Sequence, residues 1–143
     1  MSINEFFAKY NGKFVDYDGA FGTQCVDLMR QYCKDVLGVA GYVAIPQTGN
    51  AKDIFRNFPL GGNQYFSKVF NTPTNMPKKG DVLFFKTSLW FPFLFGWAGH
   101  VGIVESADLY NLVLFNQNYP TGRYCEFRKF KYKDCQGWLI PKK

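Results

Sequence analysis

The sequence predicts an α+β fold in which N-terminal helices pack against a C-terminal antiparallel β-sheet. Up to Phe58, apolar side chains recur at steps of three and four residues, which is the period of an amphipathic helix. From Gly80 onward, short β-branched and aromatic runs follow one another at hairpin distances, a pattern typical of antiparallel strands. Because the helices come first and the strands second, we expect a single domain over residues 1–143 with one core between the two halves.

Capping residues mark the expected helix starts. Ser2 and Glu5 have the spacing of a capping box before the first helix. Thr23 and Asn50 are suitable N-caps for the second and third helices, because their side-chain oxygens can accept backbone N–H groups. The predicted helices cover residues 3–10, 24–38 and 50–58, and turns or loops are predicted over 41–49, 61–62 and 73–80.

Short apolar runs mark the expected strands. Their composition and close spacing predict an antiparallel sheet that is curved or barrel-like. The predicted strands cover residues 81–86, 100–105, 112–116, 124–128 and 137–140.

Composition limits the function classes. A chain of 143 residues with 47% hydrophobic residues is a globular domain, which excludes a disordered or coiled-coil segment. The net charge of +6 favours anionic partners such as nucleic acid, a membrane or a cell wall, but the lysines form no stripe, so we expect no nucleic-acid binding. The apolar stretch 89–104 is interrupted by Pro92 and glycines and is too short for a membrane helix, and the first residues lack a secretory-signal pattern.

The cysteine pattern argues against a structural metal site. The four cysteines show no C-x-x-C spacing and are accompanied by a single histidine, so a zinc site is not expected. We expect free thiols, although Cys125 and Cys135 could face each other across a hairpin.

Cys25 is the candidate nucleophile. It falls in the first turn of the second predicted helix, where the partial positive charge of unpaired N–H groups is expected to lower the pKa of the thiol and favour the reactive thiolate. The alternative is that Cys25 is a small buried apolar residue, as most free cysteines are.

Carboxylates surround this cysteine at the spacing of a calcium loop. Counting Asp16 as position 1, Asp18 is position 3 and Asp27 is position 12, while Ala20 and Gly22 take positions 5 and 7. The carboxylates and the two backbone carbonyls could converge on one Ca²⁺. A polar turn, with Asp27 as a partner of the helix dipole, is the alternative.

His100 is the candidate base because the chain has no other histidine. Gly99 and Gly102 are expected to leave room for a substrate or another helix beside its ring. At the end of the next predicted strand, Asn116 and Asn118 face the same side. Asn116 is our choice for the group that orients the imidazole, and a strand-end turn is the alternative role for these asparagines.

Together these residues resemble the CHAP family, the cysteine- and histidine-dependent amidohydrolases/peptidases, and in particular the calcium-binding CHAP domains of phage endolysins. The matching segments run in family order along nearly the whole chain. They are Asp16-x-Asp18-Gly-x-x-Gly-Thr-Gln-Cys25-Val-Asp27-Leu, Gly49-Asn-Ala-Lys-Asp53, Gly80-Asp-Val82, Gly99-His-Val-Gly-Ile-Val104 and Asn116-Gln-Asn118-Tyr.

The resemblance implies a papain-like fold and a set of site residues. It implies Cys25 as nucleophile, His100 as general base and then acid, and Gln24 as a contributor to the oxyanion hole. Ca²⁺ would be held by Asp16, Asp18, Asp27 and the carbonyls of Ala20 and Gly22. We also expect Asn50, Trp97 and Asn118 to contact substrate. Trp97 ends the aromatic insert 90–97 before His100, for which core packing with an apolar loop tip is the alternative. Lysins of this type often carry a glutamate where this chain has Asn116, so its orienting group is an amide.

The resemblance also implies the biological setting. A monomeric lysin would be made in the host cytoplasm, reach the wall by holin-type release or virion delivery, and cut an amide bond of Gram-positive peptidoglycan. The bond would be of the D-alanyl-glycyl type or that of an N-acetylmuramoyl-L-alanine amidase. Alternatives are a tail-associated lysin, a bacterial autolysin or toxin with the same chemistry, and a non-catalytic wall-binding module.

Overall fold

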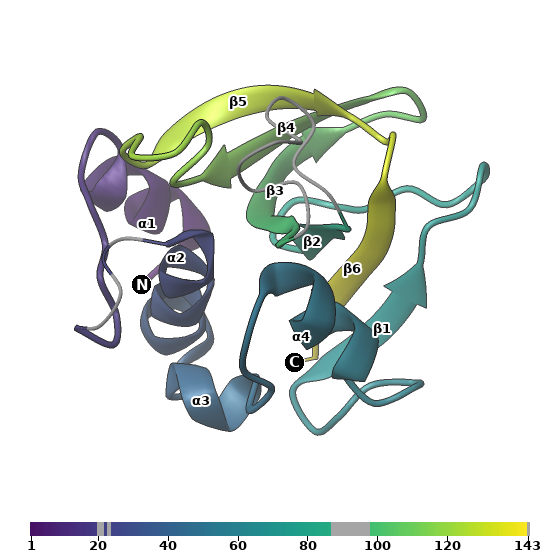
Figure 1. Ribbon diagram of the computed structural model, residues 1–143, viewed down its shortest axis with the longest axis horizontal. Helices are drawn as coiled ribbons and strands as arrows, with labels where there is room; N and C mark the ends of the chain where they lie inside the picture. The colour runs from purple at the N-terminus through teal and green to yellow at the C-terminus, as the bar shows by residue number, and fades with distance from the viewer. Residues whose placement is uncertain (20–21, 23, 87–97, 143) are drawn as a thin grey trace.

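Helices occupy the first part of the chain and a curved antiparallel sheet the second (Figure 1). The computed structural model describes residues 1–19, 22, 24–86 and 98–142. In this described part no helix has the length and apolar character needed to cross a membrane. The elements are α1 (Ile3–Tyr10), α2 (Cys25–Tyr32), the π-helical turn η1 (Cys33–Leu37), α3 (Gly41–Ala44), α4 (Ala51–Asn57), β1 (Phe66–Phe70), β2 (Val82–Phe85), β3 (His100–Ala107), β4 (Asn111–Asn116), β5 (Glu126–Lys131) and β6 (Cys135–Pro141).

The described strands form a sheet in the order β1-β6-β2-β3-β4-β5, with every neighbouring pair antiparallel. Register shifts interrupt the ladder between Phe84 and Phe85 and between Val104 and Ser106. Such bulges bend a strand and increase its twist, and the sheet curves strongly from β1 to β5 (Figure 1). The predictions of an α+β class and of a curved sheet are therefore confirmed.

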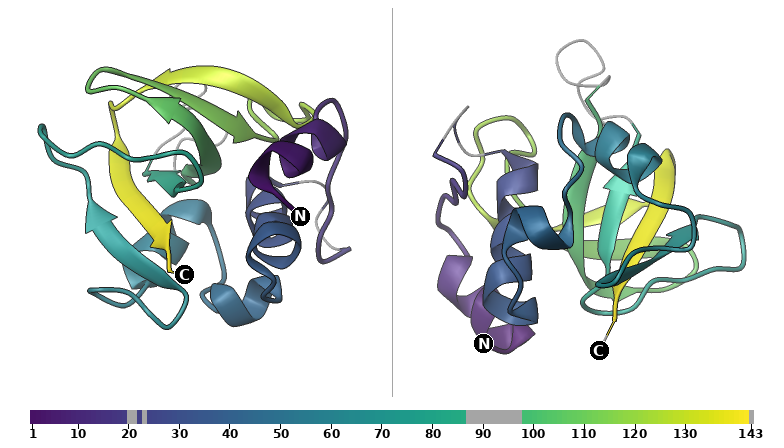
Figure 2. Two further views of the ribbon diagram at one scale, coloured as in Figure 1. Left: turned by 180° about the vertical axis from the view of Figure 1, so that it is seen from behind. Right: turned by 90° about the horizontal axis from the view of Figure 1, so that it is seen from below.

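The helices lie on one side of the sheet, as the purple and blue segments in Figure 2 show. Helix α2 packs on β3, and α4 packs on β2 and β6. Alternate strand residues face these helices, among them Phe84, Val101 and Ile103. The opposite face carries a second cluster that includes Leu83 and Trp138, so the prediction of one core was incomplete: the curvature of the sheet lets its far side bury apolar side chains as well.

The second predicted helix is divided. Its regular part, α2, ends at Tyr32, and the π-helical turn η1 continues it to a left-handed C-cap at Gly38, where φ is 74°. The N-cap of α2 is Gln24, and the predicted cap Thr23 lies outside the described residues. The first helix begins as predicted, because Ser2 and Glu5 form the capping box.

Strand β1 was not predicted, because a lysine lies on its buried face. Lys68 is 9% exposed between the buried Phe66 and the end of α4. Its Nζ donates to the carbonyls of Phe55 at 2.6 Å and Phe58 at 2.8 Å at the C-terminus of the helix, where carbonyls lack their usual α-helical donors. A charged residue at that position hides the apolar alternation by which a strand is recognised.

Candidate active site

Cys25 is the first residue of α2, and its side chain is half-buried against β3. The helix start is fixed locally, because the backbone N–H of Gln24 donates to Asp27 Oδ2 at 2.9 Å and the N–H of Asp27 donates to the carbonyl of Gln24 at 3.0 Å. The backbone N–H of Val101, the residue that follows His100, is close enough to the thiol to lower its pKa.

His100 begins β3 and is 4% exposed. Its Nε2 lies 2.9 Å from Oδ1 of Asn116, the last residue of β4. Asn116 Nδ2 donates to the carbonyl of Glu126 at 3.1 Å, so the amide presents its oxygen, which can only accept, to the ring. Nε2 therefore carries the proton, and Nδ1 is left with the lone pair that a general base needs.

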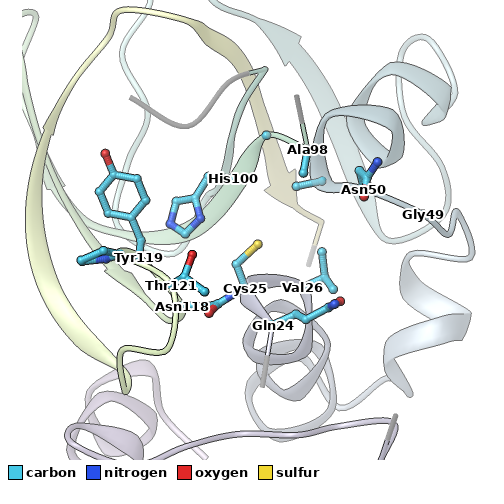
Figure 3. Close-up of a pocket in the computed structure, with 13 residues that line it drawn as sticks. Gln24, Cys25, Val26, Gly49, Asn50, Ala98, His100, Asn118, Tyr119 and Thr121 are labelled. Carbon is cyan, nitrogen blue, oxygen red and sulfur yellow. The ribbon is translucent and has the colours of Figure 1, made fainter. Parts of the chain in front are cut away.

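Cys25 and His100 line the same pocket, which has a volume of about 220 Å³ (Figure 3). In the view of Figure 3, Asn118, Tyr119 and Thr121 lie on the histidine side and Gly49 and Asn50 on the opposite side. The amide end of Gln24 lies on the other side of Cys25 from the imidazole. A carbonyl placed over the sulfur would thus have a base on one side and an amide donor on the other. The remaining lining residues are Val26, Ala51, Ala98, Gly99 and Pro120.

Burial keeps the imidazole neutral. The His100 ring lies 4.9 Å from the ring of Tyr119 and 5.9 Å from that of Phe130, centroid to centroid. Removal from water is the main cause that lowers the pKa of His100 to about 4, and the charge of Arg128 lowers it further, while the bond to Asn116 raises it. The base is therefore unprotonated at neutral pH.

The expected lowering of the Cys25 pKa was wrong. Burial is the largest effect and raises the pKa of this thiol to about 11, although the backbone N–H groups of Val101 and Val26 lower it. A helix terminus contributes roughly 0.3–1 kcal/mol, whereas desolvation can shift a pKa by several units. At neutral pH the thiol and the imidazole are therefore both neutral, and an attack by this sulfur would require transfer of its proton.

The His100 pKa can be measured without ambiguity because the chain has one histidine. We expect the ring-proton NMR signals to titrate with a midpoint near pH 4. The unfolded chain, with a histidine pKa of about 6.5, binds more protons than the folded one between these pH values. Stability attributable to His100 is therefore lost as the pH falls from about 6.5 to about 4. A midpoint at or above 6.5 would contradict the buried, neutral base.

The glycines around His100 make room for other parts of the protein, and the expectation that Gly102 leaves room for a substrate or a helix was wrong. A Cβ at Gly99, where φ is 76°, would lie 2.4 Å from the carbonyl oxygen of Phe85 and 2.8 Å from the backbone nitrogen of Lys52 on α4. Gly99 thus admits a helix, one of the two expected neighbours. A Cβ at Gly102 would lie 3.3 Å from Cβ of Asn116, so this glycine admits the side chains of β4.

A cluster of carboxylates lies beside the nucleophile helix. In the described part of the chain, oxygens of Asp16, Asp18 and Asp27 all lie within 4.8 Å of one another. Asp27 is 1% exposed, whereas the other two are exposed. Burial first, and then the charges of Asp18 and Asp16, raise the pKa of Asp27 to about 6. Hard oxygen donors in this arrangement suit Ca²⁺, so the residues fit the predicted ion.

Comparison with known proteins settles the family. The family model of the CHAP domain matches residues 14–118. This chain belongs to the CHAP family. The match includes Cys25, His100 and both asparagines of the predicted site, and the structure of this CHAP domain confirms the predicted fold.

Relatives of the CHAP domain include two curated phage proteins. Endolysin PlyTW of Staphylococcus phage Twort is 37% identical over 96 residues, which cover 67% of this chain and 18% of that protein. The D-alanyl-L-alanine endopeptidase of Streptococcus phage B30 is 37% identical over 85 residues, which cover 59% of this chain and 18% of that protein. The chain thus spans about a fifth of the length of these curated relatives.

Solved structures share the fold. The crystal structure of the wild-type endolysin LysIME-EF1 matches with a TM-score of 0.72 at 24% identity, over 99% of this chain and 64% of that one. The crystal structure of Ly7917 matches with a TM-score of 0.67 at 19% identity, over 99% of this chain and 63% of that one.

Of the other predicted site residues, some line the pocket of this CHAP domain and others lie outside the described residues or away from the pocket. Asn50 and Asn118 line the pocket, but Asn118 Oδ1 accepts the N–H of Gly122 at 2.7 Å, the strand-end turn role that was its alternative. Trp97 and Ala20 lie outside the described residues. Gly22 is described and exposed, with φ of 75°.

Two buried groups next to the site were not singled out from the sequence. Tyr119 packs on His100, and its place directly after the Asn-Gln-Asn segment was the available signal. Gln117 is fully buried between the two asparagines, where strand alternation turns it away from the pocket side of Asn116. A polar residue at such a position needs buried hydrogen-bond partners.

Proposed function

We propose that this CHAP domain is the catalytic domain of a phage-type peptidoglycan hydrolase that cleaves an amide bond of the bacterial wall peptide through a cysteine nucleophile. The observation that carries the proposal is the presence of Cys25 and the Asn116-oriented imidazole of His100 in one pocket. Relatives named as an endolysin and as a D-alanyl-L-alanine endopeptidase support this substrate class. An endopeptidase is favoured over an N-acetylmuramoyl-L-alanine amidase by the second of these names alone.

Acylation would begin from the neutral pair. His100 Nδ1 takes the thiol proton while Cys25 Sγ forms a bond to the amide carbon, and the carbonyl π electrons move to oxygen. The backbone N–H of Cys25 and the side chain of Gln24 would donate to that oxyanion. Collapse of the adduct breaks the C–N bond, and the protonated imidazole gives its proton to the leaving amine.

Deacylation would repeat the chemistry with water. His100 Nδ1 removes a proton from water as its oxygen attacks the thioester carbon. The second adduct collapses, the C–S bond breaks, and the proton returns to the sulfur. Asn116 would hold the Nε2–H tautomer throughout, and it would stabilise the imidazolium less than a carboxylate would.

The test is digestion of purified Gram-positive peptidoglycan by residues 1–143, followed by mass spectrometry of the products. New termini at a peptide bond would support the endopeptidase, and a free lactyl group with a new N-terminal alanine would identify the amidase. A non-catalytic wall-binding module would release no new termini while still sedimenting with the wall. That result, obtained with folded protein, would overturn the proposal.

We propose that Asp16, Asp18 and Asp27, with the carbonyls of Ala20 and Gly22, bind Ca²⁺. The support is the chemistry of the donors and the proximity of the carboxylate oxygens. The ion would neutralise the cluster and tie the loop before Cys25 to the first turn of α2. In this role it is structural, because the acyl transfer described above needs only side chains and backbone of the chain.

Calcium is expected to raise the melting temperature of the domain by about 5–10 °C at a hundredfold excess over its Kd. The measurement is thermal unfolding with Ca²⁺ and with EDTA. Asp18→Asn is expected to remove most of the shift, because it takes a charged ligand from the cluster. The matched control is Asp53→Asn, which changes an exposed ion pair with Arg56 and should keep the full shift. An equal response of wild type and Asp18→Asn would refute the site.

Peptidoglycan would be the partner of a monomeric domain, and delivery to the wall would follow holin-type release or come from the virion, as the endolysin relatives suggest. Size-exclusion chromatography with light scattering tests the monomer, with a mass near 16.5 kDa expected for this chain.

A further inference from the structure

Gln117 connects the strand that carries Asn116 to the peptide that precedes the nucleophile. Its side chain is 0% exposed. Nε2 donates to the carbonyl of Gln24 at 2.8 Å and to the carbonyl of Val15 at 2.8 Å. Oε1 accepts from the N–H of Val15 at 2.7 Å and from the thiol of Cys125 at 3.3 Å. The amide is therefore fully used, and two of its partners, Val15 and Gln24, lie 102 and 93 residues away in sequence.

The bond to Gln24 has a consequence at Cys25. The carbonyl of Gln24 and the N–H of Cys25 belong to one peptide group, which is planar and trans, so fixing the direction of the oxygen fixes the opposite direction of the N–H. The Gln24 oxygen accepts from Gln117 on one side and from the N–H of Asp27 at 3.0 Å on the other. The plane of this peptide is thus held by two donors.

The same bond strengthens the donor. A hydrogen bond to a peptide oxygen polarises the group and makes its N–H a better donor, with cooperative effects of roughly 10–30% per bond. Electrostatic stabilisation of an oxyanion depends on donors that are oriented before the reaction. Gln117 neither lines the pocket nor touches a reacting atom, so its influence must pass through the peptide.

We propose that Gln117 is a positioning residue for the oxyanion hole: its Nε2 aims and polarises the Gln24–Cys25 peptide, whose N–H receives the charge of the tetrahedral adduct. The inference rests on the proposed function only in taking Cys25 N–H as an oxyanion donor. Consecutive residues of one strand end would then serve the two halves of the site, with Asn116 orienting the base and Gln117 orienting the donor.

The test compares two reactions of the same sulfur. p-Nitrophenyl acetate acylates a thiol through a tetrahedral oxyanion. Methyl methanethiosulfonate instead reacts by thiol attack on its methylthio sulfur, which releases methanesulfinate, leaves a methyl disulfide on the cysteine and places no charge on a carbonyl oxygen. Mass spectrometry of proteolytic peptides reports each modification at Cys25 separately from the other cysteines. Neither reagent is a wall fragment, so the result stands even if no peptidoglycan bond is cleaved.

Gln117→Met keeps the volume of the side chain and removes the donor. We expect acylation of Cys25 to slow by about tenfold to a hundredfold. Complete removal of an oxyanion donor costs about 100-fold to 1000-fold, and here the donor is kept but less well oriented. The rate at which methyl methanethiosulfonate modifies Cys25 should stay within about twofold, because the thiol and His100 keep their surroundings. If Gln117→Met does not fold, Gln117→Asn serves instead, because the shorter amide cannot reach both carbonyls. For this variant too, acylation of Cys25 should slow while its reaction with methyl methanethiosulfonate should not.

Asn63→Leu is the matched control. Asn63 Nδ2 donates to the carbonyl of Ala44 at 2.9 Å, and its Oδ1 accepts the N–H groups of Tyr65 and Phe66, so it also joins separate backbone segments, but outside the pocket. Its loss should lower the melting temperature and leave both rates unchanged. A purely structural Gln117 would behave in the same way or slow both reactions equally, and either result overturns the proposal.

Discussion

Replacing Cys25 with alanine is expected to abolish cleavage of the wall peptide, with a loss of at least about 1000-fold in rate. The sulfur supplies the electron pair that forms the acyl-enzyme, and no other described residue of the pocket is a thiol. The measurement is the rate at which a peptidoglycan suspension clears, together with mass spectrometry of the released termini. Circular dichroism and the melting temperature establish that the variant is folded.

Cys135→Ala provides the control for this experiment. Cys135 is also a half-buried free thiol, but it lies at the start of β6 and does not line the pocket. It should retain the wild-type rate, which separates loss of the nucleophile from loss of any thiol. Clearing by a folded Cys25→Ala protein at more than a few per cent of the wild-type rate would exclude the proposed mechanism.

The sequence predicted those helices and strands whose formation depends on residues close together in the chain. The capping box of α1 involves residues three apart, and the strands from β2 onward were recognisable as short apolar runs of neighbouring residues. The errors arose where a distant contact decides. Lys68 lies on a buried strand face because α4 presents its last carbonyls there. The short helix α3 begins at Gly41, where a Cβ would lie 2.5 Å from Cβ of Arg30 on α2.

The site divides in the same way. Cys25 was predicted as a thiol at a helix start and His100 as the one imidazole of the chain, and both line one pocket. Asn116 was chosen over Asn118 although no signal in the sequence separated the two, which are expected to face the same side. The pKa of Cys25 was not predictable, because it depends on how much water the folded pocket excludes. The role of Gln117 was hidden for a related reason: its partners at residues 15 and 24 come together only in the fold.

Asn116→Leu is expected to lower kcat by about 100-fold or more with little change in KM, since a wrong histidine tautomer is costly in acyl transfer. Leucine has a similar size but cannot accept the proton of His100 Nε2. The imidazole then loses the partner that keeps Nδ1 unprotonated and directed toward the sulfur. Nitrogen-15 NMR of the single histidine measures the tautomer directly, and we expect the share of the Nε2–H form to fall.

Two further variants make the result specific to the oxygen of Asn116. Asn111→Leu changes another asparagine of β4, whose Oδ1 accepts Lys131 Nζ at the exposed end of the strand, and should leave kcat and the tautomer as they are. Asn116→Asp keeps an acceptor 2.9 Å from Nε2 in place and adds a negative charge, so it should retain most of the activity and raise the pKa of His100 above its value of about 4. If Asn116→Leu kept the wild-type kcat while its tautomer changed, acyl transfer in this domain would not depend on how the imidazole is oriented.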